Sequence, residues 1–232
     1  MSFYGSLVSR LAPLYRLPHV VGGHTEVHVR GVEKLGERIF PYMPQVDPLE
    51  YRVTAWLHNV DRCLVLRQEI LTNVGGLTAH LWATLSESPF DHAARGRIVD
   101  AVLQHGKRDG DLAKDSPLLT AIRIADKLDR LTPTNIMAGP AHRSDLPHYD
   151  IEQPFGYRTN KDCHLKFFFW NLEWYGMLPY DWARNLVDEN FFKLFLLFLR
   201  ELGRDIALRH GIENAIEDDI RTALGSHYDK WQ

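Results

Sequence analysis

The sequence predicts an all-α protein. Apolar residues recur at helical spacing over most of the chain, and no alternating run of β-branched residues is long enough to predict a strand. With 232 residues, 45% of them hydrophobic, the chain can bury one large core, or one core with an appended subdomain. We therefore expect a helical bundle with an α-helical carboxy-terminal extension.

The composition argues against several classes of function. A net charge of −3, from 27 basic and 30 acidic residues, provides no electrostatic footprint for nucleic acid or an anionic membrane, so we expect neither as a partner. Cys63 and Cys163 lie outside any CxxC pair, which argues against a disulfide framework or a thiolate zinc site and fits a cytoplasmic protein. Residues 1–20 lack the apolar run and cleavage pattern of a signal peptide, and we expect a packed helix there.

Two predicted helices each carry a histidine near the apolar stripe. Residues 25–40 form the first, which starts at a Thr25 cap and places His28 on its inward stripe. Residues 48–71 form the second, with His58 at the border of its apolar face. The inward residues are Val32, Leu35, Gly36 and Ile39 in the first helix, and Val53, Trp56, Leu57, Val60 and Leu64 in the second.

Two further helices repeat this pattern. Asp91 is expected to cap a helix that ends at His105, on the continuation of its apolar stripe. The other begins near Pro117 and carries Asp126 beside its apolar face. Their inward residues are Ala94, Ile98, Ala101 and Val102, and Leu118, Ile122 and Ala125.

Between residues 132 and 163 four prolines and two glycines interrupt the periodicity, which predicts a long irregular loop. An aromatic-rich helical region follows over 164–224. We divide the chain into a helical core with its amino-terminal helix, residues 1–135, and a second part, residues 136–232. The second part contains the loop and the helical extension, which we expect to pack on the same core.

Residues 191–199 are the most apolar window of the chain, but the window is far shorter than the roughly 20 residues of a spanning helix and contains Lys193. A helix that is apolar on nearly every side must be buried on every side. We expect burial in the core of the bundle, or alternatively in the seam of a homodimer.

Four helices therefore place a metal-binding type of side chain at or near a buried face, namely His28, His58, His105 and Asp126. Any one of them alone would be explained as a hydrogen-bonded core residue, a helix cap or an ion-pair partner. Together they indicate a site, because buried polar groups are costly unless they satisfy one another or hold an ion.

The order of these residues resembles that of the HD-domain superfamily of metal-dependent phosphohydrolases, an all-α bundle with the signature His…His-Asp…Asp. The similar segments are HxxxHVRGV at 24–32, AWLHN at 55–59, IVDAVLQH at 98–105 and ADKLDRL at 125–131. The resemblance covers residues 20–135 and implies an HD-domain-like helical bundle.

Carried over by position, the resemblance implies that His28, His58 and Asp126 are metal ligands, with Asn59 in the place of the family's metal-binding aspartate. His105 matches an additional histidine that completes a second metal site or contacts the substrate phosphate in some members. The residues with an implied catalytic role are His58, Asn59, His105 and Asp126.

Four basic residues are candidate contacts for an anionic substrate. Lys127 and Arg130 follow Asp126 as in relatives, and Lys107 and Arg108 follow His105 directly. The alternative is that the first pair is solvated or ion-paired surface and the second pair belongs to a solvated connector.

Asn59 is the main departure from the family pattern. Two histidines and two aspartates would neutralise a divalent cation, whereas the set with Asn59 leaves a residual positive charge. A neutral amide oxygen is also a weaker donor that cannot bridge two metals, so a two-metal site is disfavoured. Asp61, three residues after His58, could restore the charge, or it could pair with Arg62 or Arg67 at the surface.

The resemblance implies a phosphohydrolase that acts on a nucleotide or another small phosphorylated compound through a weakened mononuclear site. The cofactor would be a divalent ion, with Mn, Fe, Ni, Co, Mg and Zn all open. The alternative is a catalytically degenerate HD-like protein that serves as a ligand-binding or interaction module. The Asn59 replacement favours this alternative, and the joint retention of the histidines and Asp126 favours the enzyme.

Overall fold

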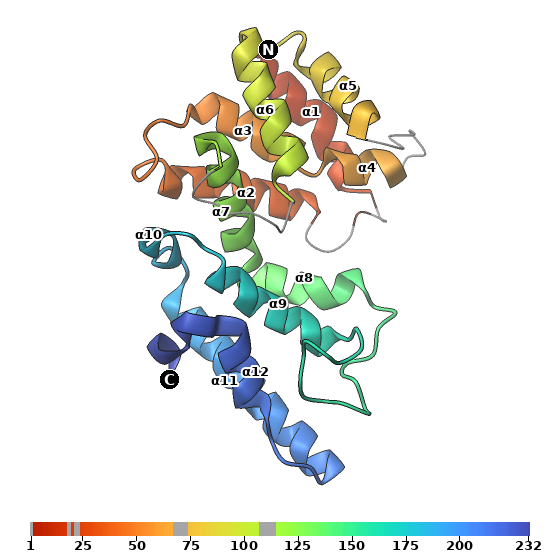
Figure 1. Cartoon of the computed structure of the whole chain (residues 1–232). Helices are drawn as coiled ribbons and strands as arrows, with labels where there is room; N and C mark the ends of the chain where they lie inside the picture. Colours follow the sequence, from red (N-terminus) through yellow and green to blue (C-terminus); the bar gives the residue numbers. More distant parts are fainter. Residues whose placement is uncertain (1, 18–19, 21–23, 67–73, 107–114) are drawn as a thin grey trace. The chain divides into compact units, whose positions relative to one another are not determined.

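The computed structural model describes residues 2–17, 20, 24–66, 74–106 and 115–232 (Figure 1). The elements in this part of the chain are helices, without a strand, which confirms the all-α class. None of these helices is both long and apolar enough to cross a membrane. The chain divides into two compact units, Met1–Asp129 and Arg130–Gln232, with the division somewhat earlier than the one expected after residue 135.

The first unit is built around one central helix. Its elements are α1 (Phe3–Tyr15), α2 (Glu26–Ile39), α3 (Pro48–Leu57), α4 (Val60–Leu66), α5 (Val74–Leu85), α6 (His92–Gln104) and α7 (Pro117–Arg130), which ends at the boundary. Helix α3 packs against α1, α2 and α6, while α5 packs on α6 and α1 on α4.

Local sequence explains why α3 starts and packs as it does. Asp47 caps the helix by accepting hydrogen bonds from the Leu49 and Glu50 amides, and Pro48 occupies the first turn, where it loses no helical hydrogen bond. Tyr51 is fully buried and donates to the Val32 carbonyl of α2 at 2.6 Å. These contacts hold α2 and α3 together, and each of the two helices supplies one histidine to the interior.

The helices predicted for the first unit are present, except that the one over 48–71 is interrupted, and their apolar stripes lie inside. The predicted inward residues are buried, except that Leu35 is partly exposed. Thr25 occupies the N-cap position of α2, although its side chain makes no capping hydrogen bond. Asp91 caps α6 by accepting from the Ala94 amide at 2.7 Å, and α7 begins at Pro117 as expected.

The predicted continuous helix over 48–71 is wrong at its centre. Helix α3 ends at Leu57, a turn contains His58 and Asn59, and α4 begins at Val60. Successive side chains on an α-helix diverge by about 100°, since there are 3.6 residues per turn. The turn instead brings the side chains of His58 and Asn59 into contact, at the same buried point.

The second unit holds the aromatic carboxy-terminal helices. Its elements are α8 (Pro133–His142), α9 (His164–Gly176), α10 (Asp181–Arg184), α11 (Glu189–His210), α12 (Ile216–Leu224) and the 3₁₀ helix η2 (Gly225–Trp231). Helix α12 packs on α9 and α11, and α8 packs on α9. Within its core the ring of Tyr175 stacks on that of Phe192, and the ring of Trp231 meets Tyr175 edge-on and Phe192 at a tilt.

Two predictions for the second unit need correction. The loop expected over 132–163 begins with helix α8, because Pro133 lies in the first turn, where proline is compatible with a helix. The window 191–199 is buried on one side only. Its inner residues are Phe192, Phe195, Leu196 and Leu199, and its outer residues Leu194, Leu197 and Phe198 are at least half exposed. The inner residues have the spacing of one stripe of an amphipathic helix. This stripe is not apparent in the sequence, because the outer positions are also leucine and phenylalanine.

Candidate metal centre

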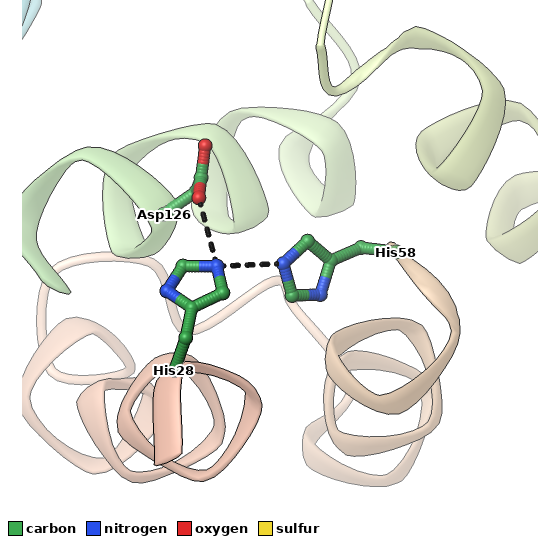
Figure 2. Close-up of side chains that lie close together, drawn as sticks. All are labelled: His28, His58 and Asp126. Carbon is green, nitrogen blue, oxygen red and sulfur yellow. Dashed lines mark hydrogen bonds and ion pairs between the residues drawn. The ribbon is translucent and has the colours of Figure 1, made fainter. Parts of the chain in front are cut away.

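Three side chains from different helices converge in the interior of the first unit. His28 comes from the first turns of α2, His58 from the end of α3 and Asp126 from α7 (Figure 2). One ligand atom from each of them lies within 4.8 Å of the others, so this group could hold a metal ion. Both histidines are buried, and the Asp126 side chain is 14% exposed.

The nitrogen and oxygen atoms of this group have the spacing of ligands that share an ion. The His28 Nε2 atom lies 3.1 Å from His58 Nε2 and 3.2 Å from Asp126 Oδ1 (Figure 2). Two donors about 2.1 Å from one ion lie about 3.0–3.4 Å apart at octahedral and tetrahedral angles. These two distances are compatible with a shared ion, and the three residues together could hold a single divalent ion.

His28 is held by a second aspartate. Its Nδ1 lies 2.6 Å from Asp129 Oδ2, and both side chains are buried. An ionised carboxylate only accepts hydrogen bonds, so Nδ1 is the donor. In a neutral His28, this leaves a lone pair at Nε2, which faces the other two members of the group.

His58 has the same arrangement of its two nitrogens. Its Nδ1 donates to the Ala55 carbonyl oxygen at 2.6 Å, which leaves Nε2 as the acceptor toward the centre. Burial lowers the pKa of His58 well below its usual value, as do the neighbouring His105 and His28, while Asp126 and the Ala55 carbonyl act in the opposite direction. A neutral imidazole is the form that binds a metal ion.

Asn59 lies beside this centre but turns its nitrogen toward it. The amide Nδ2 donates to His58 Nε2 at 2.8 Å, and the side chain is buried. A metal-binding Asn would present Oδ1 instead, which requires a half turn of the amide about its last side-chain bond. Its predicted role as a ligand stays a prediction.

His105 is the third imidazole at the centre. Its ring centroid lies 5.2 Å from that of His58, and its Nδ1 donates to the Val102 carbonyl oxygen at 2.7 Å. The hydrogen bond orients the ring at the end of α6, where the sequence placed it. His105 is partly buried, and its predicted catalytic role is untested by this geometry.

The four basic residues predicted to contact an anionic substrate have different surroundings. Lys107 and Arg108 lie outside the described residues. Arg130 stacks on an aromatic ring, with its guanidinium carbon 5.1 Å from the centroid of Trp174, and Lys127 is partly buried. Their roles as substrate contacts remain predictions.

Asp61 does not join the group of possible ligands. Its Oδ2 lies 3.6 Å from Arg62 Nε, which is the surface pairing considered as its alternative role. The carboxylate beside the histidines that sequence reasoning missed is Asp129. It lies within the ADKLDRL segment, one helical turn after Asp126, and that spacing was the available signal.

Comparisons of this chain with protein-family models, curated proteins and solved structures found no match. The functional interpretation therefore depends on the geometry of the centre and on the order of its motifs.

Proposed function

We propose that this protein is a metal-dependent phosphohydrolase that acts on a nucleotide or another small phosphorylated compound. The observation that carries the proposal is the convergence of His28, His58 and Asp126, with ligand atoms within 4.8 Å of one another. The resemblance of the four motifs to the HD-domain superfamily supports the same class of reaction.

His28, His58 and Asp126 would hold the ion through two imidazole nitrogens and one carboxylate oxygen. A bound divalent ion supplies Lewis acidity, which makes water a better nucleophile near neutral pH and stabilises charge on phosphoryl oxygens. Imidazole ligands favour Mn, Fe, Co, Ni and Zn over Mg, which prefers oxygen donors. We therefore narrow the expected cofactor to a transition metal.

The neighbouring side chains would act on the water and the substrate. The proton on His105 Nδ1 is committed to the Val102 carbonyl, so its Nε2 is the atom that can exchange a proton or contact a phosphate oxygen. Asn59 would stay neutral, and its amide would orient His58 or, after rotation, offer Oδ1 to the ion.

Two observations favour a second candidate, a catalytically degenerate bundle that binds ligands or partners. The 3.2 Å contact between His28 Nε2 and Asp126 Oδ1 could equally hold a proton, with an imidazolium paired to both Asp126 and Asp129. The Asn59 amide already donates a hydrogen bond to His58 Nε2 and thereby occupies the lone pair that would bind an ion. In this alternative the centre is a buried ion-pair network without chemistry.

Metal analysis separates the two candidates. The protein is purified without chelator, its metal content is measured, and it is then supplied with Mn²⁺, Co²⁺, Ni²⁺, Fe²⁺ or Zn²⁺ and assayed on nucleoside monophosphates. We expect about one transition metal ion per chain and phosphatase activity that Asp126→Ala removes. Asp100→Ala, on the exposed side of α6, is the matched control and should retain both. A chain that takes up none of these ions would refute the enzyme proposal.

A further inference from the structure

We infer that Asp129 is the positioning residue of this centre: it fixes the proton of His28 on Nδ1 and supplies the negative charge that Asn59 lacks. The effect on metal binding depends on the proposed function. The effect on His28 itself does not, because it follows from the contact between the two side chains.

The contact between Asp129 and His28 is short and shielded from water. Asp129 Oδ2 lies 2.6 Å from His28 Nδ1, with the His28 side chain fully buried and that of Asp129 only 7% exposed. A hydrogen bond to an ionised acceptor is stronger than a neutral one, and low exposure strengthens it further. The proton is therefore held on the side of the ring that faces away from His58 and Asp126.

Without the Asp129 acceptor, His28 could adopt the other neutral tautomer, with its proton on Nε2. Asp126 Oδ1 lies 3.2 Å from His28 Nε2, so a proton on Nε2 would gain a carboxylate acceptor there. That tautomer would place a hydrogen where the ion is expected and would turn a ligand into a donor. Asp129 offers the stronger hydrogen-bond acceptor at Nδ1 of His28 and so keeps Nε2, the atom that would bind the ion, unprotonated.

Gly31 provides the room in which Asp129 can reach His28. A Cβ atom at position 31 would lie 2.0 Å from Asp129 Oδ1 and 2.7 Å from its Cγ, which are distances that real contacts do not reach. Glycine is unfavourable in the interior of a helix, so its presence in α2 is explained by this close approach. A side chain at position 31 would displace the carboxylate.

Asp129 also restores the charge balance that the sequence lacks at Asn59. When ionised, Asp126 and Asp129 together supply two negative charges, which would balance the two positive charges of a divalent ion bound by two neutral histidines. Asp129 is not among the three side chains that could hold the ion, so it would act through His28. Residues that orient ligands in this way change metal affinity by about 10–100-fold when they are removed.

The first test reads the tautomer of His28 directly in the metal-free protein. Nitrogen chemical shifts of ¹⁵N-labelled protein at pH 8 should show wild-type His28 protonated on Nδ1. Asp129→Ala should move the proton to Nε2, and Asp129→Asn, which retains an oxygen acceptor, should largely preserve it on Nδ1. A wild-type His28 without a proton on Nδ1 would overturn the inference, whether or not the protein binds metal.

The second test measures the affinity for Mn²⁺ and Ni²⁺ by calorimetry. We expect Asp129→Ala to weaken binding about 10–100-fold, and Asp129→Asn to weaken it less, because only the charge is lost. Gly31→Ala should resemble Asp129→Ala through the displaced carboxylate. Its matched control is Gly96→Ala in α6, where an added Cβ would meet no atom within 4 Å.

The outcomes distinguish this inference from the proposed function. Wild-type affinity in both Asp129 variants, with their folds verified by circular dichroism, would refute the positioning role. Absence of binding to the wild-type protein would refute the proposed function instead, and the tautomer measurement would then decide the role of Asp129. The isosteric Asp129→Asn covers the case in which Asp129→Ala does not fold.

Discussion

The Nε2 atoms of His28 and His58 face one another at 3.1 Å in the interior of the first unit. Each ring donates its Nδ1 proton outward, to Asp129 and to the Ala55 carbonyl oxygen. Two neutral rings in this arrangement would bring two lone pairs together, so a metal ion between them is stabilising. The relationship explains why the stability of this protein should respond to metal ions, to charge at the centre and to pH.

Metal ions are expected to stabilise the fold. At a concentration one hundred times its dissociation constant, Mn²⁺ or Ni²⁺ should raise the free energy of unfolding by about 2.7 kcal/mol, and a chelator should reverse the gain. Asp126→Asn should reduce the gain because it removes the charged ligand of the group. Thermal unfolding with and without metal provides the measurement, with Asp100→Asn on the exposed side of α6 as control. An identical gain in Asp126→Asn would place the ion elsewhere.

Asn59→Asp is expected to have effects of opposite sign with and without metal. In the metal-free protein the substitution replaces the donor that faces His58 Nε2 with an acceptor, which should cost about 1–3 kcal/mol or raise the pKa of the new carboxyl. With Mn²⁺ or Ni²⁺ present the added charge should increase metal affinity and stability. The exposed Asn214→Asp is the control, because the Asn214 side-chain oxygen already accepts a hydrogen bond from the Ile216 amide and Asp retains it. A variant that is less stable in every metal and no more active would favour the degenerate bundle.

The stability of the metal-free protein should fall as the pH decreases below about 6.5. Burial, together with the neighbouring His105 and His28, lowers the pKa of His58 well below its usual value, whereas the unfolded chain takes up the proton near pH 6.5. The unfolded state therefore binds more protons in acid, and the free energy of unfolding decreases by up to about 1.4 kcal/mol per pH unit from this residue. Denaturant titrations in chelator between pH 5 and 8 would measure the slope. His58→Gln should flatten it, and His92→Gln, at the exposed start of α6, should not.

The two sides of α11 should respond differently to truncation. Phe192 is fully buried, so Phe192→Ala should lower the free energy of unfolding by about 3–5 kcal/mol. Phe198 is 50% exposed, and Phe198→Ala should cost about 1 kcal/mol or less. Urea unfolding of both variants at several protein concentrations tests the difference. Equal losses that depend on concentration would point to the homodimer seam that the sequence suggested for this window.

The sequence by itself determined helices α2, α6 and α7 of the first unit and the order of the residues at their centre. The 3.6-residue spacing of apolar side chains marks α2, α6 and α7 directly, since each helix buries one stripe. His28 and Asp126 could be assigned to that buried side because they share the periodicity of their neighbours. In contrast, the turn at His58 and Asn59 could not be predicted, because the apolar pattern continues across it from α3 into α4.

Only the tertiary structure decided what surrounds the three converging side chains. Asp129 and His28 are separated by 101 positions in the chain, and the spacing of Asp129 one turn after Asp126 places both on one side of α7 without indicating which helix they meet. Gly31 looks unfavourable for α2 until the Asp129 carboxylate is seen in the space of its missing Cβ. The direction in which Asn59 presents its amide also depends on the position of His58 Nε2. Periodicity determines which face of a helix is buried, but which side chains meet across buried faces is set by how the helices pack.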